Sequence, residues 1–269
     1  MEKVGLGLRF SFMEDVLNGS QKPDWFEIAP ENWMSRGGKM FDILEKIRAD
    51  IPIVCHGLSL SIGSPDDLDF IFLKELKQFL DYFEIDVYSE HLSFSSLDNG
   101  YLYDLFPVPF TEDRVKHISK KIKIVQDVLE RKLILENISY YFKFDGEMEE
   151  VDFINQVLEE GNCELLLDIN NVYVNSMNHN YDPVEFIKNI NKEKVAYYHI
   201  AGHEKFDDLL IDTHGAQVNS QVFNLLEIAL EEIGEKPTLL ERDNNIPPYE
   251  QLFEEYEKLK EFVENAKVY

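Results

Sequence analysis

The chain has few cysteines, and it lacks the sequence signals of secreted and membrane proteins. Its 269 residues include two cysteines, Cys55 and Cys163. Two are too few for a disulfide framework, and both lie in apolar runs, which is typical of a reducing cytoplasm. No uncharged apolar run approaches the ~18 residues of a membrane-spanning helix, and the first residues show no basic region followed by an apolar one. We therefore expect a cytoplasmic protein with no membrane partner.

Positive charge is also scarce. Lys and Arg number 26 against 52 Asp and Glu, which gives a formal net charge of −26. A surface with this charge repels a phosphate backbone, so nucleic acid is excluded as the default partner. The acidic residues are spread along stretches of helical spacing, which indicates a solvated outer surface that could still help to select a basic partner.

Short β-rich segments alternate with stretches of helical spacing along the chain. The eight β-rich segments are Val4–Leu8, Trp25–Ile28, Ile53–His56, Asp86–His91, Leu133–Glu136, Leu165–Asp168, Val195–Ile200 and Thr238–Glu241. The helical stretches are Phe41–Ala49, Leu68–Phe83, Glu112–Glu130, Glu149–Glu160, Pro183–Asn191, Ser220–Ile233 and Tyr249–Ala266.

This alternation predicts an α/β fold with a parallel sheet. Eight units of about 34 residues match the ~250-residue norm of a (β/α)8 TIM barrel, so we expect one TIM-barrel domain over residues 1–269. An open doubly wound sheet is the alternative, but no Gly-x-Gly-x-x-Gly turn opens a helix after any strand. Gly5 and Gly7 lie inside the first strand, where they indicate close packing.

Side chains that commonly bind metals stand at the carboxyl ends of six predicted strands and in one following loop. Since the active site of a parallel barrel is built at this end, we expect them to converge. They are His56, His91, Glu136, Asp168, His199 and Glu241 at the strand ends, and Asp212 and His214 in the loop after the seventh strand.

So many carboxylates and imidazoles in one confined mouth are costly without a cation, because of desolvation and like-charge repulsion. Three or more imidazoles with four carboxylates exceed what one tetrahedral ion uses. The sequence therefore predicts two or three metal ions that share bridging carboxylates. Any one of these residues, such as a strand-end aspartate that caps a helix, is more often structural. The coincidence at one end of consecutive strands is what supports the prediction.

Four other residues of similar type have a different interpretation. Strand alternation points Cys55 away from His56, which indicates a buried cysteine that is not a ligand. His117 is expected on the surface of a helix, and His179 is expected to form hydrogen bonds in a loop. His203 has two interpretations, substrate binding or support of the site from outside the ligand set.

In chain order, several motifs resemble those of a known family. They are Gly5-Leu-Gly-Leu-Arg9, Trp25-Phe-Glu-Ile-Ala-Pro-Glu-Asn32, His56-Gly-Leu-Ser-Leu-Ser61, Ser89-Glu-His-Leu-Ser93, Glu136-Asn137, Leu167-Asp-Ile-Asn-Asn171, His199-Ile-Ala-Gly-His203, Ile211-Asp-Thr-His-Gly215 and Leu240-Glu-Arg-Asp-Asn-Asn-Ile-Pro247. They span nearly the full chain. They are similar to motifs of the multinuclear non-haem iron enzymes that modify ribosomally made peptides, the UPF0276 (DUF692) family. This family contains the methanobactin and 3-thiaglutamate biosynthesis oxidases and the maturases of copper-binding bufferin peptides.

The resemblance implies a xylose-isomerase-like TIM barrel and an iron- and O2-dependent oxidation of cysteine in a precursor peptide. The product is either an oxazolone with an adjacent thioamide or a cysteine that has lost a carbon. The implied ligands of two or three irons are His56, His91, Glu136, Asp168, Asn171, His199, Asp212, His214 and Glu241. Asn171 replaces the histidine of related zinc nucleases. The implied partners are the precursor peptide and a gene-neighbouring protein that presents its leader.

The chain departs from the family at two places. Members often carry a histidine shortly after the Gly-Leu-Arg strand, where this chain has Phe12, and Ala29-Pro30 replaces a motif that commonly contains histidine. We therefore expect peptide recognition or the surroundings of the ligands to differ here. Further candidates for substrate positioning are Arg9, Glu31, Asn32 and Arg242; Arg242 is alternatively a counter-charge for the carboxylates.

Two other functions stay open from the sequence. The first is a zinc- or manganese-dependent hydrolase or isomerase that acts on phosphoesters or sugars. The net charge of −26 and the missing histidine at position 171 disfavour DNA repair, and no lysine stands at the strand ends as in a sugar isomerase. The second is a metal- or peptide-binding subunit without catalysis. Metal content and colour distinguish iron from zinc.

Overall fold

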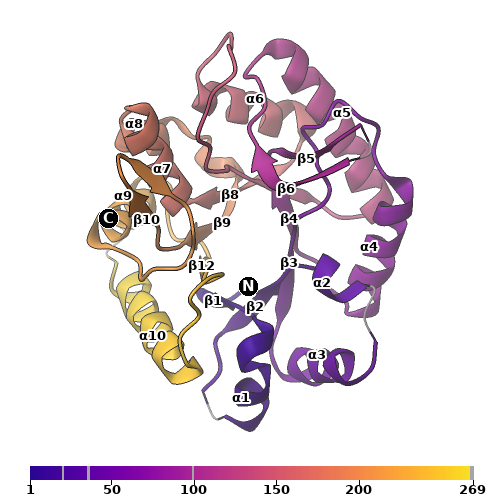
Figure 1. Ribbon diagram of the computed structural model, residues 1–269, viewed down its shortest axis with the longest axis vertical. Coiled ribbons are helices and arrows are strands. Elements are labelled where there is room, and N and C mark those ends of the chain that lie inside the picture. The colour runs from indigo at the N-terminus through magenta and orange to yellow at the C-terminus, as the bar shows by residue number, and fades with distance from the viewer. Residues whose placement is uncertain (20, 35–36, 99, 267–269) are drawn as a thin grey trace.

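The chain folds around a closed barrel of eight parallel strands (Figure 1). The computed structural model describes residues 1–19, 21–34, 37–98 and 100–266. Neighbouring strands around the barrel are β1 (Val4–Gly7), β2 (Trp25–Ile28), β3 (Ile53–Gly57), β4 (Tyr88–His91), β7 (Leu133–Glu136), β8 (Glu164–Asp168), β9 (Val195–Ile200) and β12 (Thr238–Leu240), and β12 pairs with β1. The TIM barrel is confirmed, and each predicted strand lies within two residues of its observed bounds.

Seven amphipathic helices cover the barrel where the sequence predicts them. They are α3 (Lys39–Asp50), α4 (Phe70–Tyr82), α5 (Glu112–Leu129), α6 (Glu150–Gly161), α8 (Pro183–Asn189), α9 (Ser220–Glu232) and α10 (Tyr249–Asn265). In α4, for example, the side chains of Leu73, Leu76 and Leu80 recur at helical spacing and are buried against the sheet. No helix in the described ranges is long and apolar enough to cross a bilayer.

The sequence did not predict three short helical segments and one longer helix. The short ones lie at three places along the chain: η1 (Phe10–Phe12) continues directly into α1 (Met13–Asn18), α2 (Glu31–Met34) follows β2, and the 3-10 turn η2 (Lys192–Lys194) follows α8. The longer one is α7 (Ile169–His179), which contains four asparagines and no Asp, Glu, Lys or Arg, so its propensity for helix is low. Its N-cap compensates, because the Asp168 carboxylate accepts a hydrogen bond from the backbone N–H of Asn171 at 2.6 Å.

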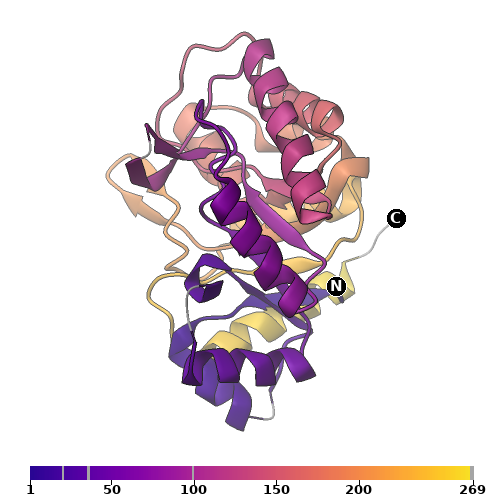
Figure 2. The same cartoon turned by 90° about the vertical axis from the view of Figure 1, so that its right-hand side faces the viewer.

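Two antiparallel hairpins also interrupt the alternation of strands and helices. One joins β5 (Phe94–Leu97) to β6 (Gly100–Phe106), and the other joins β10 (Glu204–Phe206) to β11 (Leu209–Ile211). Both follow the carboxyl end of a barrel strand, and Figure 2 shows them at the same end of the barrel, opposite the two termini. They therefore build up the wall around the mouth in which the predicted site lies.

A layer of apolar side chains fills the barrel below the mouth. It consists of Trp25, Val54, Ile134, Leu166, Tyr197 and Leu239, all buried. The Trp25 ring lies directly over Gly5, where any Cβ would overlap it, so the close packing predicted for this glycine is confirmed. The layer closes the barrel interior beneath the polar site.

A half-buried carboxyl group on α6 anchors the loop that follows β7. The Tyr140 hydroxyl donates a hydrogen bond to Glu150 Oε2 at 2.7 Å, and burial raises the pKa of Glu150 from 4.5 to about 7. The folded chain therefore keeps a proton that the unfolded chain releases at lower pH. This contribution to stability is fully present below about pH 4.5 and is lost as the pH rises through about 7.

We expect the Glu150→Gln variant to lack this pH dependence, because its amide is neutral and still accepts from Tyr140. Between about pH 5 and about pH 8, the free energy of unfolding of the parent should fall relative to that of the variant by about 2 kcal/mol. Urea unfolding of both proteins at the two pH values measures the difference. An identical pH dependence in the two proteins would show that Glu150 is ionised in the folded chain.

Candidate metal centre

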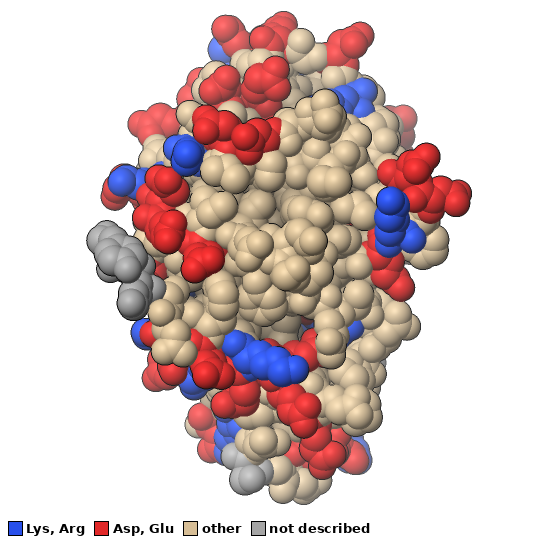
Figure 3. Space-filling view, turned by 90° about the vertical axis from the view of Figure 1, so that its left-hand side faces the viewer, with Lys and Arg blue, Asp and Glu red and all other residues tan. Residues whose placement is uncertain are grey.

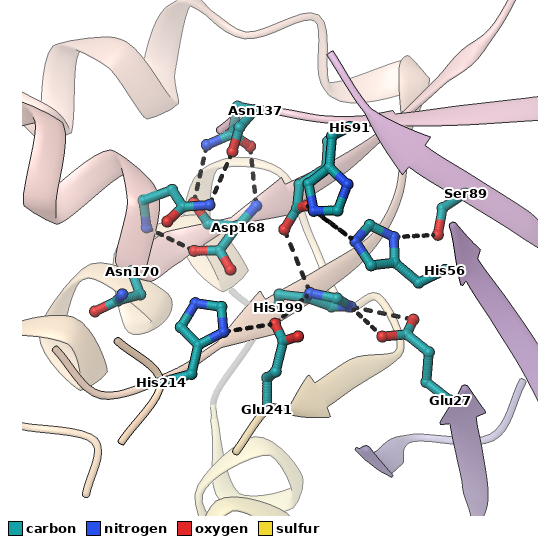
Figure 4. Close-up of polar contacts among 12 residues, drawn as sticks. Glu27, His56, Ser89, His91, Asn137, Asp168, Asn170, His199, His214 and Glu241 are labelled. Atoms are coloured by element: carbon teal, nitrogen blue, oxygen red, sulfur yellow. Dashed lines mark hydrogen bonds and ion pairs between the residues drawn. The ribbon is translucent and has the colours of Figure 1, made fainter. Parts of the chain in front are cut away.

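The first group of metal-binding atoms lies where β3, β4 and β7 end. The Nε2 atoms of His56 and His91 are 3.1 Å apart, and each lies 3.1 Å from Glu136 Oε2 (Figure 4). Parallel pairing of the three strands brings these ends together. Three donor atoms that converge on one small volume in this way are an arrangement that could hold a cation.

A second group shares Glu136 with the first. His199 Nδ1 lies 3.4 Å from Glu136 Oε1 and 3.1 Å from Glu241 Oε2. Asp168, which follows the apolar core of β8, completes this group. All four side chains are buried. Glu136 Oε2 faces the first group and Glu136 Oε1 faces the second, so this carboxylate offers one oxygen to each of two neighbouring groups.

A third group shares Glu241 with the second. His214 Nδ1 lies 3.4 Å from Glu241 Oε2 and 3.1 Å from Asp243 Oδ2. Asp243 was not among the residues predicted from the sequence, and it is also the ion-pair partner of Arg9. Asp212 lies on the other side of the imidazole, with Oδ1 at 2.7 Å from His214 Nε2, and it belongs to none of the three groups.

Several polar atoms of the site are buried without a hydrogen-bond partner. They include Asp168 Oδ2 and Asn171 Oδ1. The orientation of Asn171 is fixed, because its Nδ2 donates to the carbonyl oxygen of Asn137 at 3.1 Å and so leaves the side-chain oxygen as the free acceptor. Buried polar atoms left unpaired are costly, and bound cations would remove that cost for acceptors of this kind.

The titration behaviour of the site reflects its close packing of charge. Burial alone would lower the pKa of His91, but Glu136 and Glu90 outweigh it and raise the pKa to about 9. Burial and the neighbouring Glu136 and Asp212 carboxylates raise the pKa of Asp168 well above its usual range. The imidazoles and carboxylates thus compensate one another with protons, which is the role that metal ions take over when they bind.

A chain of buried hydrogen bonds connects two imidazoles of the site from below. Tyr197 donates to Glu27 Oε2 at 2.9 Å, and Glu27 Oε1 lies 3.0 Å from His199 Nε2. In the other direction, Ser89 Oγ lies 2.6 Å from the Tyr197 hydroxyl and 2.8 Å from His56 Nδ1. Since the Tyr197 proton goes to Glu27, Ser89 donates to Tyr197 and the Nδ1–H of His56 donates to Ser89.

This chain determines which imidazole nitrogens face the site without a proton. When the rings are neutral, His56 carries its proton on Nδ1 and His199 carries its proton on Nε2, so His56 Nε2 and His199 Nδ1 are the nitrogens that would bind a cation. The three residues of the chain were not predicted from the sequence. The available signal was Glu27 in an otherwise apolar strand, but its partner Tyr197 is 170 residues away.

Above the groups, the mouth opens into a cavity of about 800 Å³. Its floor includes His56, His91, Glu136 and His214, and its wall includes Tyr101, Tyr103 and Leu105 of β6. Tyr103 is 92% exposed and has a positive φ of 57°, a conformation that costs a non-glycine residue energy. The wall therefore offers an exposed aromatic surface beside the metal-binding atoms.

The remaining candidates have structural contacts. Cys55 is buried in the hydrophobic core between the barrel and its helices, as predicted, and not in the layer around Trp25 inside the barrel. Glu31 Oε1 accepts from the backbone N–H groups of Leu58 and Ser59 and so holds the loop after β3, and Asn32 lines the mouth cavity. The prediction that Arg242 positions substrate or neutralises the carboxylates of the site is wrong, because its guanidinium binds both carboxylate oxygens of Glu255 on α10.

Two histidines differ from their predicted settings. His117 lies in the middle of α5 as expected, but it is half-buried, with Nε2 2.9 Å from the carbonyl oxygen of Ser64. His179 is the last residue of α7 and not part of a loop, and its Nε2 lies 2.8 Å from the carbonyl oxygen of Tyr140. Neither belongs to the three groups.

Comparison with known proteins shows which family has sequences similar to this chain. Residues 3–264 match a family model described as "RiPP precursor modification enzyme MbnB/TglH/ChrH", where RiPP denotes a ribosomally synthesised and post-translationally modified peptide. A UPF0276 protein of Shewanella sediminis is 49% identical over 262 residues, which cover 97% of this chain and 94% of the relative. A UPF0276 protein of Acinetobacter baylyi is 48% identical over 258 residues, 96% of this chain and 90% of the relative.

Solved structures with the same fold are distant in sequence. A D-psicose 3-epimerase from Clostridium cellulolyticum superposes with a TM-score of 0.65 at 13% identity, covering 99% of this chain and 100% of that chain. Endonuclease IV from Thermus thermophilus gives 0.63 at 11% identity, covering 98% of this chain and 100% of that chain. At this identity the likeness establishes the xylose-isomerase-like barrel and does not extend to activity.

Proposed function

Because this chain belongs to the MbnB/TglH/ChrH family of RiPP precursor modification enzymes, we propose that it is an iron- and O2-dependent oxidase of cysteine in a precursor peptide. The observation that carries the proposal is the arrangement of the three donor groups, which share Glu136 and Glu241. Carboxylates shared between neighbouring groups are what a multinuclear site requires, and a single-ion site would not need them.

The donor set fits two or three iron ions. The residues that would hold them are His56, His91, Glu136, Asp168, Asn171, His199, Asp212, His214 and Glu241, and Asp243 is an additional candidate from the third group. Imidazole with carboxylate is a common ligand mixture for non-haem iron, and the unpaired buried oxygens of Asp168 and Asn171 fit cations as their partners. When bound, iron supplies a Lewis-acidic and redox-active centre that favours thiolate over thiol and reacts with O2.

The protein's own residues prepare the site for this chemistry. The Glu27–Tyr197–Ser89 chain holds His56 and His199 in the tautomers that present lone pairs. The apolar layer around Trp25 keeps water out of the barrel below them. Arg9 pairs with Asp243 and lies 3.7 Å from Glu241 Oε1, so it offsets part of the negative charge at the rim of the mouth.

We infer that the peptide enters across the aromatic wall of β6. A cavity of about 800 Å³ admits a segment of several residues, and its floor is the metal-binding surface. We expect Tyr103→Ala to weaken binding of the precursor peptide roughly 10-fold, because an exposed tyrosine at such a wall is a typical anchor. Isothermal titration measures this. Tyr82→Ala, which removes an exposed tyrosine of α4, is the control; equal losses in both variants would contradict a specific role for the wall.

We propose that the chain acts as a single domain. We also propose that it binds the presenting protein that the resemblance implies. Figure 3 shows a face whose centre carries no Lys, Arg, Asp or Glu side chains, although charged side chains surround it. Two stretches without these residues, 169–181 and 213–226, contain α7 and the first part of α9, which pack together. Depletion of charge is typical of the centre of a protein interface, which supports a protein partner.

The direct test combines the iron-loaded protein with a cysteine-containing precursor peptide. The proposal predicts O2 consumption and a change in peptide mass that is lost when the peptide cysteine is replaced by serine. A zinc-loaded protein that leaves the peptide unchanged and turns over phosphoester or sugar substrates would contradict it. An iron protein that binds the peptide and consumes no O2 would indicate a binding subunit.

A further inference from the structure

A second hydrogen-bond chain leads from the start of α9 to the site, and its direction is unambiguous. It begins at the backbone N–H of Val222, which donates to Asn219 Oδ1 at 2.9 Å as part of the helix cap. Asn219 therefore presents its Nδ2 to His203, and Nδ2 lies 3.1 Å from His203 Nε2. Because an amide nitrogen can only donate, His203 Nε2 is an acceptor and carries no proton.

The donors and acceptors of the next two contacts, His203 with Asn170 and Asn170 with Asp212, follow in the same way. The proton of a neutral His203 must be on Nδ1, which lies 2.7 Å from Asn170 Oδ1. Asn170 Oδ1 accepts this hydrogen bond, so its Nδ2 is turned to Asp212 and donates to Oδ1 at 2.7 Å. The chain ends on a carboxylate, which only accepts. Every group in the chain therefore has one orientation that satisfies all of its neighbours.

We propose that His203 is a positioning residue that fixes the side-chain amide of Asn170 and thereby orients Asp212 beside His214. The two ends of an asparagine amide are nearly equal in shape, so without His203 the Asn170 amide could turn over. Its oxygen would then face the Asp212 carboxylate, and the two acceptors would repel each other. The Nδ1–H of His203 prevents that orientation, and the half-buried ring is held in place by stacking on Tyr173 with 5.2 Å between ring centroids.

Asp212 depends on this contact because few groups hold it. Besides Asn170, the Ser139 hydroxyl donates to Oδ2 at 3.0 Å, while Oδ1 faces His214 Nε2 at 2.7 Å. Asn170 is therefore the neutral donor on the oxygen that faces His214. Burial lowers the pKa of His203, which agrees with a neutral ring. The consequence for metal binding rests on the proposed function, but the orientation of the chain does not.

The first test measures the tautomer of His203 directly. Long-range nitrogen–proton NMR spectra of the metal-free full chain labelled in histidine distinguish protonated from unprotonated ring nitrogens, and the signals missing from His203→Phe assign the residue. We expect Nδ1 to be protonated and Nε2 to be unprotonated. A proton on Nε2 would overturn the proposal, whether or not the chain binds iron.

The second test uses a matched pair of substitutions. His203→Phe keeps the ring stacked on Tyr173 and removes both nitrogens, whereas His203→Asn places an amide donor near the position of Nδ1. We expect Fe(II) binding, measured by anaerobic titration, to weaken about 10-fold in the first variant and to return to within about 3-fold of the parent in the second. Equal Fe(II) affinity in the parent and in His203→Phe would overturn the positioning role. Failure of the parent itself to bind Fe(II) would instead overturn the proposed function.

Discussion

Glu136→Gln is expected to release metal from two of the three donor groups at once and to abolish turnover. Glu136 Oε2 lies 3.1 Å from both His56 and His91, and Oε1 lies 3.4 Å from His199 Nδ1. The amide keeps the size of the side chain but removes its negative charge and one of its two acceptor oxygens. The loss of metal affinity should exceed the 10- to 100-fold that follows loss of an outer partner of a ligand.

The matched control for this variant is Glu164→Gln. Glu164 begins β8, at the opposite end of the barrel from the mouth, so the same change of charge occurs on a barrel strand without touching the site. Metal content by elemental analysis and circular dichroism of both variants separate loss of metal from loss of fold. Full metal content in folded Glu136→Gln would remove Glu136 from the ligand set and with it the argument for a shared carboxylate.

Trp25→Ala is expected to destabilise the folded barrel strongly. The ring is fully buried, packs edge-on against Tyr197 with 6.1 Å between centroids, and lies over Gly5, which has no side chain to fill the space. Because the surrounding side chains project from the strands of a closed barrel, they can relax little into the cavity. We expect the free energy of unfolding to fall by about 3–5 kcal/mol.

The same substitution should also weaken metal binding. Loss of the indole removes the support beneath Tyr197, whose hydroxyl links Glu27 to Ser89 and so holds His199 and His56. Trp25→Phe, which keeps an aromatic ring in the layer, is the control and should retain most of both properties. Chemical denaturation and Fe(II) titration measure the two effects. A loss below about 1 kcal/mol in Trp25→Ala would contradict the close packing of this layer.

The sequence was sufficient to predict the barrel and the convergence of the strand ends. Both follow from local patterns, since β-rich segments alternate with amphipathic stretches and parallel strands bring their ends together. Helix α7 was missed because its asparagines have low helix propensity and the cap that starts it, Asp168, is also a predicted ligand. The hairpin β5–β6 was missed because its exposed strand β6 has no regular alternation, and Tyr103 leaves the extended conformation.

The supporting contacts of the site could not be predicted from local patterns. Glu27 and Tyr197 meet across the barrel interior, and Asn170 in the first turn of α7 meets His203 in the loop after β9, which no periodicity describes. Asp243 was overlooked because it lies two residues beyond Glu241, outside β12, where the backbone has already turned. Such contacts depend on the shear of the closed barrel and on loop conformation, which the sequence specifies only through the whole fold.

Elemental analysis of protein purified without added metal, together with its visible absorption spectrum, tests the central claim most directly. It examines the three donor groups before any peptide is known. We expect two or three irons per chain and a coloured protein, because imidazoles and shared carboxylates form the site. Colourless protein that contains zinc alone and remains inactive after reconstitution with iron would contradict the proposed iron-dependent oxidase.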